Sequence, residues 1–281
     1  MPATYAHWAF GRECIEKMPK NLQTIIHDNR DIYNLGVHGP DIFFYYLTKS
    51  KVVKYGYSLH NVPMEEFFKK AKQAFESHEE KAEMLAYLMG FLTHFVLDSS
   101  THGYIERKIE ESNVTHNTIE AQWERHMMLM DYRTPNLIDR SEALKPNKKI
   151  SKVISYFYPF NEKVVYKSCK WQRFCLKLLS AITPFKQNFM QNLAKKIGME
   201  SYADLYIGFE EAEECRDSNL RLDKLAINAL KLYPKLMKNL LNYLNGQEGL
   251  DKYFNHDLSP WPDYKKILVL PIKKEIDYKV K

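Results

Sequence analysis

The feature that most limits the fold is an uncharged apolar run from Met84 to Leu97, which contains His94 and ends at Asp98. Its 14 residues are too few for a helix that crosses a bilayer. A helix buried in the core of a globular protein suits this run better. We therefore expect the chain to fold around this segment, and we expect no membrane span.

Composition favours an all-α fold. The 281 residues are 45% hydrophobic and 14% aromatic, which excludes a disordered chain. Only 10 glycines and 12 prolines argue against the many tight turns of an all-β protein. Apolar spacing and end signals predict helices over residues 5–18, 63–75, 77–97, 116–130, 171–179, 185–197 and 222–244. Residues 77–80 form a predicted capping box, residues 99–101 a polar break, and residues 259–272 an irregular tail.

Charge is uneven along what we interpret as a single domain of residues 1–281. Residues 145–200 carry 12 Lys and Arg against 2 Asp and Glu, with aromatic residues interleaved. This basic helical part could contact an anionic lipid surface or single-stranded nucleic acid. The favoured interpretation is a solvated lysine face over an aromatic core, because lysine stems cover apolar surface while their charges stay in water.

The first residues indicate the cellular location of the protein, and the cysteines indicate which kinds of site are not expected. The first residues lack the apolar stretch and cleavage site of a secretory leader, so we expect a cytoplasmic protein. The four cysteines show no Cys-x-x-Cys pair. They indicate neither a thiolate zinc site nor a disulfide framework.

Histidine and carboxylate pairs follow the apolar run at helical spacing. His94 with Asp98, and His116 with Glu120, are four residues apart and therefore share a helix face. Imidazole and carboxylate are common ligands of zinc and similar divalent metals. The alternative is that His94 is a hydrogen-bonded core histidine. Asp98 one turn later would then be a buried carboxylate in need of a partner, which favours the metal interpretation.

The position of His102 implies more than one metal. On a continuous helix it would lie roughly 12 Å from His94 along the axis, too far to share one ion. Asp98 would then lie between two ions, unless the helix breaks after it. Sites with two metals are typical of phosphoester cleavage.

These motifs resemble those of the zinc-dependent phospholipase C family, which is all-helical and distantly related to single-strand-specific fungal nucleases. The chain has His-x-x-x-Asp at 94–98, then His102, then His-x-x-x-Glu at 116–120. Upstream, residues 36–41 resemble the family's Gly-x-x-x-Pro-Asp segment. His60 and His7 match two further ligand positions, and the motif-bearing part covers residues 1–130.

The resemblance implies two or three zinc ions. It assigns the first zinc to Asp41, His60, His94 and Asp98, and the second to His102, His116 and Glu120. A third would use His7 and the other oxygen of Asp98. In the secreted enzymes an N-terminal residue completes this third site, and their spacer before the residue that corresponds to His102 is longer.

The expected activity is that of a zinc-dependent phosphoric diester hydrolase with Asp41 as catalytic base and a phosphodiester such as a phospholipid as substrate. The alternatives are a nuclease, a small-molecule phosphodiesterase, or a non-catalytic metal-stabilised protein that binds anionic lipid or nucleic acid. His38 would bind substrate phosphate or orient a ligand, and the alternative is an ordinary turn residue. Glu124 would orient a ligand histidine, and the alternative is a solvated carboxylate.

Overall fold

The computed structural model describes residues 3–180, 183–196, 198 and 203–280. These residues are mostly helical and include no strand, which confirms the all-α prediction. The α-helices are α1 (Thr4–Ile15), α2 (Lys20–Asp28), α3 (Arg30–Gly36), α4 (Ser50–Leu59), α5 (Met64–Ser77), α6 (Lys81–Glu111), α7 (His116–Met130), α8 (Lys148–Ser155), α9 (Glu162–Leu179), α10 (Pro184–Lys196), α12 (Arg216–Leu244) and α13 (Ile272–Glu275). The 3-10 turns are η1 (Gly39–Phe43), η2 (Pro135–Leu137), η3 (Glu213–Cys215), η4 (Lys252–Asn255) and η5 (Tyr264–Lys266).

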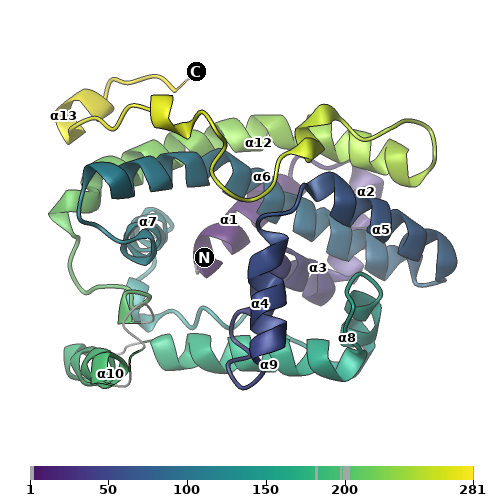
Figure 1. Ribbon diagram of the computed structural model, residues 1–281, viewed down its shortest axis with the longest axis horizontal. Helices are drawn as coiled ribbons and strands as arrows, with labels where there is room; N and C mark the ends of the chain where they lie inside the picture. The colour runs from purple at the N-terminus through teal and green to yellow at the C-terminus, as the bar shows by residue number, and fades with distance from the viewer. Residues whose placement is uncertain (1–2, 181–182, 197, 199–202, 281) are drawn as a thin grey trace.

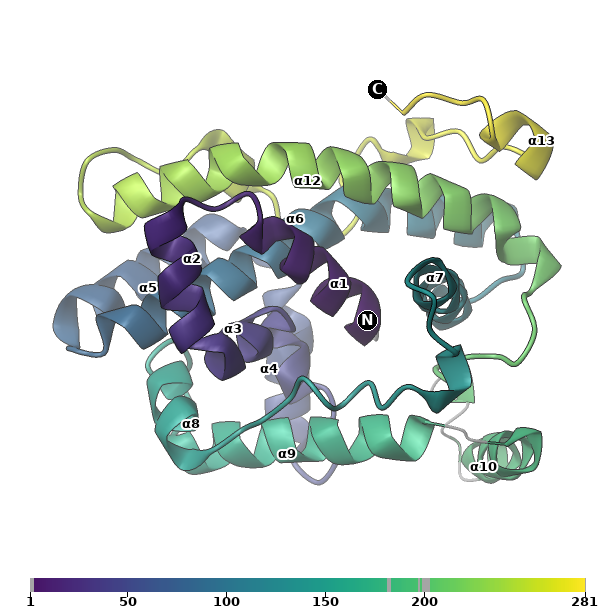
Figure 2. The same cartoon turned by 180° about the vertical axis from the view of Figure 1, so that it is seen from behind.

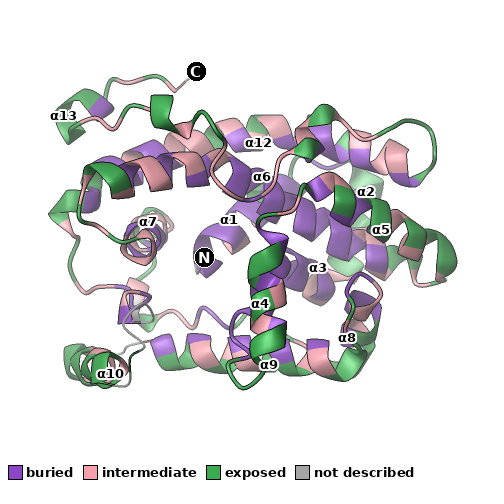
Figure 3. Cartoon of the chain, in the orientation of Figure 1, coloured by how far each residue is buried: buried purple, intermediate pink, exposed green. Residues whose placement is uncertain are grey.

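Helix α6 runs through the middle of the molecule, with α12 alongside it in both views (Figures 1 and 2). Every residue from Ala86 to Ser99 is buried, as the central band of buried ribbon in Figure 3 shows. A helix that is apolar on all sides is covered on all sides by other elements. Among the described residues, no helix is long and apolar enough to cross a membrane.

The predicted break at residues 99–101 is wrong, because α6 continues through it to Glu111. The three hydroxyls there turn back onto the helix. Ser99 Oγ donates to Phe95 O at 2.7 Å, and Ser100 Oγ donates to Val96 O at 2.7 Å. Thr101 Oγ1 donates to Leu97 O at 2.9 Å. Each polar side chain is thus satisfied by a carbonyl one turn earlier, so the helix need not unwind.

The predicted capping box at residues 77–80 is also wrong. Ser77 is the last residue of α5, and its Oγ donates to Gln73 O at 2.7 Å. Helix α6 begins at Lys81 after Glu80, and no side chain caps it. Because Ser77 belongs to the preceding helix and Glu80 is the residue before α6, Ser77 does not occupy the capping position of α6.

Helices α3 and α6 cross at very short range, because each has a glycine at the crossing. A Cβ on Gly36 would lie 2.3 Å from Tyr87 O, and a Cβ on Gly90 would lie 2.3 Å from Tyr33 O. Only a residue without a side chain allows this approach. The crossing holds the end of α3, and hence η1, against the middle of α6.

The described residues of the basic part, 145–200, form α8, α9 and α10. Helix α9 begins at Glu162, earlier than the predicted start at Trp171, while α10 lies close to the predicted range, whose last residue, 197, is outside the described residues. Phe157 and Tyr158 between α8 and α9 are buried, and the Tyr158 hydroxyl is hydrogen-bonded to that of Tyr87 at 2.6 Å. Aromatic packing therefore joins this part to α6.

The close contact of α3 and α6 at their glycines predicts that a single added methyl group lowers the stability of the protein. Gly90→Ala should lower the free energy of unfolding by about 1–3 kcal/mol, because the added carbon meets the backbone of α3, which cannot move alone. Thermal and denaturant unfolding followed by circular dichroism would measure this loss. The control is Gly249→Ala, where an added Cβ meets no atom within 4 Å. Equal stability of the two variants would contradict the close crossing.

Candidate metal centre

The centre is built around the carboxylate of Asp98 on α6. Asp98 Oδ2 lies 3.1 Å from His94 Nε2, one turn earlier. Asp98 Oδ1 lies 3.1 Å from His7 Nε2 on α1 and 3.6 Å from His102 Nε2, one turn later. The two oxygens of a single carboxylate therefore face different histidines, as the helix spacing predicted.

Asp41 and His60 lie next to His94. Asp41 is in η1, directly after Gly39 and Pro40, and its Oδ1 lies 3.3 Å from His60 Nε2 and 3.9 Å from His94 Nε2. Gly39 has a φ of 50°, and a Cβ at this position would lie 2.4 Å from His94 Cδ2. A glycine is therefore required both by the turn and by the histidine ring packed against it.

His102, His116 and Glu120 form the other end of the centre, where α6 meets α7. Glu120 Oε1 lies 3.1 Å from His116 Nε2, one turn before it, and 3.7 Å from His102 Nε2. His116 is the most exposed member, with 32% of its side chain exposed, whereas Glu120 is buried. This end of the centre is thus the more accessible to solvent.

All eight residues singled out from the sequence are brought together. Three groups place one ligand atom from each member within 4.8 Å of the others. The groups are His7 with Asp41 and His94, His60 with His94 and Asp98, and His102 with His116 and Glu120.

Backbone carbonyls hold two of the rings so that Nε2 points inward. His102 Nδ1 is hydrogen-bonded to Leu258 O at 2.5 Å, and His60 Nδ1 to Gly56 O at 3.1 Å. A carbonyl only accepts, so both rings carry a proton on Nδ1. Nε2 of a neutral ring is then left with a lone pair for a metal.

The charges in the centre depend on one another. Burial opposes charge on Asp98, but His102, His94 and His7 hold the pKa of its carboxyl well below its usual range. Burial also opposes charge on His102, yet Asp98 and Glu120 raise the pKa of this imidazole to about 9. Without a metal, a proton on His102 thus helps to balance the carboxylates. A bound cation would take over this role and release protons.

Unsatisfied atoms show that the donor set fits zinc. Asp41 Oδ1, His60 Nε2 and His94 Nε2 are buried and make no hydrogen bond within the described part of the chain. Such atoms destabilise a fold unless something else binds them. In a tetrahedral zinc site, metal–ligand bonds of about 2.1 Å place neighbouring ligand atoms about 3.4 Å apart. The separations of 3.1–3.9 Å in this centre match that spacing.

His38 lies inside the same cluster. It is buried, and its Nε2 makes no hydrogen bond to a described residue. Burial, together with the nearby His7 and His94, lowers its pKa to about 3. The ring is therefore neutral at physiological pH. It can form a hydrogen bond without adding charge to the cluster.

Glu124 does not orient a ligand histidine, contrary to the sequence-based expectation. It is fully buried, and its Oε1 accepts from the backbone N–H groups of Tyr5 and Ala6 at the start of α1. Its Oε2 accepts from Arg140 Nη1 at 2.9 Å. Glu124 thus holds the helix that carries His7. Arg140 was missed, because nothing in its local sequence shows that it is buried.

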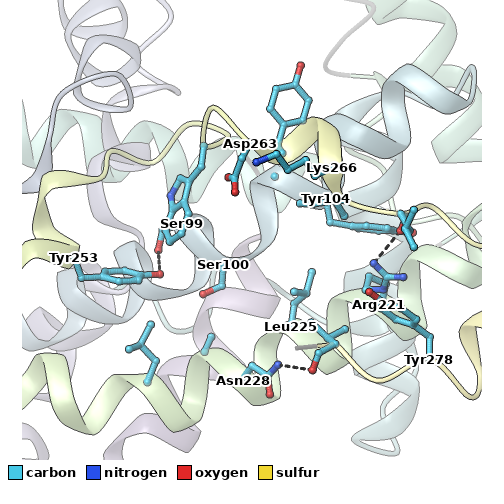
Figure 4. A pocket seen from close by; sticks show the side chains of 18 residues that line it. Ser99, Ser100, Tyr104, Arg221, Leu225, Asn228, Tyr253, Asp263, Lys266 and Tyr278 are labelled. Atoms are coloured by element: carbon cyan, nitrogen blue, oxygen red, sulfur yellow. Dashed lines mark hydrogen bonds between the residues drawn. The ribbon is translucent and has the colours of Figure 1, made fainter.

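A cavity on the opposite side of α6 is separate from the centre. It has a volume of about 550 Å³ and lies between α6, α12 and the C-terminal segment. Figure 4 shows Ser99 and Ser100 on its wall, where Ser99 is hydrogen-bonded to Tyr253, and Arg221 with Tyr278 at its other end. Since Ser99 and Ser100 directly follow Asp98 on the helix, they point away from the metal ligands' face.

Comparison with known proteins agrees with the chemistry of the centre. The model of a protein family described as zinc dependent phospholipase C matches residues 6–183, more than half of the chain. The chain belongs to this family. The match extends beyond the motif-bearing part, through α8 and α9. No curated protein and no solved structure matches the chain at a significant level.

Membership in the zinc-dependent phospholipase C family, together with the candidate metal-binding groups, supports a metal-dependent, phospholipase C-like function with zinc as the metal. The Gly-x-x-x-Pro-Asp segment has a structural role as well as supplying a candidate ligand. Its first glycine is Gly36, the residue at the α3–α6 crossing. The same short segment therefore allows the helix contact and supplies Asp41.

The buried pair of Glu124 and Arg140 predicts a pH-dependent effect. Arg140→Met should lower the free energy of unfolding by about 3 kcal/mol at neutral pH, because Glu124 is left charged, buried and without its cation. Burial already raises the pKa of Glu124 above its unfolded value, and Arg140 opposes that rise. Removing Arg140 raises the folded pKa further. The loss of stability should therefore be greatest at pH values above the pKa that Glu124 has in the folded protein. It should disappear as the pH falls below the pKa that Glu124 has in the unfolded protein, because Glu124 is then protonated in both states.

Denaturant unfolding at a series of pH values would test this. The control is Arg12→Met, whose partner Asp131 lies 3.4 Å away on a partly exposed surface and for which we expect little loss. A deficit for Arg140→Met that stays constant down to acid pH would contradict the assigned role of Glu124.

Proposed function

We propose that this protein is a zinc-dependent phosphoric diester hydrolase of the phospholipase C type, with two or three zinc ions per chain. The observation that carries the proposal is the convergence of five imidazoles and three carboxylates, from α1, η1, the end of α4, α6 and α7, with the buried Asp98 at the centre. Family membership supports zinc and a phospholipid-type substrate.

The contacts support the following ligand sets. Asp41, His60, His94 and Asp98 would hold one zinc, and His102, His116 and Glu120 a second. His7 and the Oδ1 atom of Asp98 would contribute to a third. When bound, zinc lowers the pKa of a coordinated water toward 7 and withdraws charge from the phosphoryl oxygens.

The chain's own groups would do the remaining chemistry. Asp41 would hold zinc through Oδ1 and would accept the proton of the attacking water through its other carboxylate oxygen. His38, neutral and buried beside it, would donate a hydrogen bond to a phosphoryl oxygen. The exposed side of His116 marks the side from which substrate would enter. The products would be a phosphomonoester and an alcohol.

Metal content is the first quantity that this proposal predicts. Protein purified without chelator should contain two or three zinc ions per chain, and His94→Ala should lose at least one of them because His94 belongs to two candidate groups. Elemental analysis measures this directly. His27→Ala, an exposed histidine outside the centre, should retain the full content. Wild-type protein without metal, and not loaded by added zinc, would contradict the proposal.

Asp41→Asn should lower turnover by about 100-fold or more, since loss of a general base typically has at least this effect. The substrates to compare are phosphatidylcholine, the water-soluble bis(p-nitrophenyl) phosphate and a single-stranded oligonucleotide. Asp28→Asn, on the surface, serves as the control and should be fully active. Cleavage of the oligonucleotide alone would favour a nuclease. Cleavage of none by the zinc-loaded wild type would leave a metal-stabilised binding protein.

A further inference from the structure

Helix α10 has an apolar stripe that nothing in the described structure covers. None of its residues is buried, and the helix lies at the edge of the molecule beyond the end of α9 (Figures 1 and 3). Phe185, Phe189 and Leu193 are 81%, 58% and 41% exposed. Since they are four residues apart, they lie along one face. An adjoining face of the helix packs through Met190 on Leu179, Leu205 and Tyr206.

The outer face of α9 is basic and becomes apolar toward α10. Lys163, Lys167, Lys170 and Lys177 are exposed on it, and so are Phe174 and Leu178 near its end. Residues 163–199 contain no aspartate or glutamate. Within the described chain, none of these four lysines forms an ion pair.

Two of the three lysines of α8 differ in this respect. Lys149 Nζ lies 2.9 Å from Glu83 and Lys152 Nζ lies 3.1 Å from Glu80. Their charge is therefore largely balanced by α6 and the residue before it. Among the described residues, α9 and α10 carry most of the unpaired positive charge of residues 145–200.

We infer that the outer faces of α9 and α10 form a membrane-binding surface that takes anionic phospholipid. Exposed apolar stripes with a basic rim are typical of helices that lie in the interface of a bilayer. Phe185, Phe189 and Leu193 would enter the acyl boundary, while the lysines contact headgroup phosphates. This inference rests on the proposed function, for which it supplies a route to a membrane substrate.

Lipid accounts for the surface better than single-stranded nucleic acid does. Nucleic acid binding needs aromatic rings on which bases stack, beside a basic groove. Here Leu178 and Leu193 continue the aromatic stripe, and leucine offers no stacking platform. The apolar stripe of α10 also projects outward at the edge of the molecule, as insertion into a bilayer requires.

The experiment is co-sedimentation of the zinc-loaded protein with vesicles of phosphatidylcholine containing about 30% phosphatidylglycerol. Binding should be clear at about 0.1 M salt, weaken at about 0.5 M, and be much lower with pure phosphatidylcholine. Replacing Phe185, Phe189 and Leu193 together by serine should reduce binding more than about tenfold. The control replaces the exposed Ile227, Leu268 and Ile276 by serine and should bind normally.

A second pair of variants isolates the charge. Lys163, Lys167 and Lys170 changed together to glutamine should weaken binding about fivefold for each lysine. The same change at Lys148, Lys149 and Lys152 removes equal charge from α8 and should have little effect. Equal losses for the two triple variants would show a diffuse charge effect and overturn the inference. So would binding to a single-stranded oligonucleotide, but not to vesicles, that the α10 variant abolishes.

Activity separates this inference from the proposed function. The α10 variant should cleave bis(p-nitrophenyl) phosphate at the wild-type rate but lose activity on anionic vesicles. Asp41→Asn should lose both activities and still bind vesicles. If Asp41→Asn and the wild type are equally inactive while vesicle binding follows the variants as described, the proposed function fails and the membrane surface stands.

Discussion

The burial of Asp98 constrains the rest of the structure. Its carboxylate lies inside an otherwise apolar stretch of α6, where an isolated charge would be strongly unfavourable. Three imidazoles, from positions 7, 94 and 102, surround it and lower its pKa. Two of them come from the same helix, one turn on either side. The third requires α1 to be packed against α6, which is why α1 lies deep in the molecule.

Close packing of backbones provides the other half of the centre. The Gly36–Gly90 crossing brings α3 against α6, so the turn that follows α3 lies over His94. Gly39 then permits the turn itself, and Asp41 comes directly after it. Metal chemistry and helix packing are therefore not separate features of this chain. The same six residues, 36–41, serve both.

Much of the centre could be predicted from sequence, because helix periodicity relates residues that are four apart. The pairs 94–98 and 116–120 and the bridging position of Asp98 needed no tertiary information, and the family match bears out the resemblance. The predicted break at Ser99 failed because side-chain hydroxyls can bond within a helix. Glu124 was misjudged because its partners, the start of α1 and Arg140, are distant in sequence or in a loop. Such contacts have no periodic signal.

One contact described above bears on the order in which the protein can fold. All eight candidate ligands lie within the first 120 residues, yet the His102 ring is held by Leu258, which is 156 positions later in the chain. The same loop is tied to the end of α4, since Leu258 N donates to His60 O. During synthesis, the ligands emerge from the ribosome long before this loop does. The ring that His102 presents to a metal is therefore fixed only after residue 258 has been synthesised.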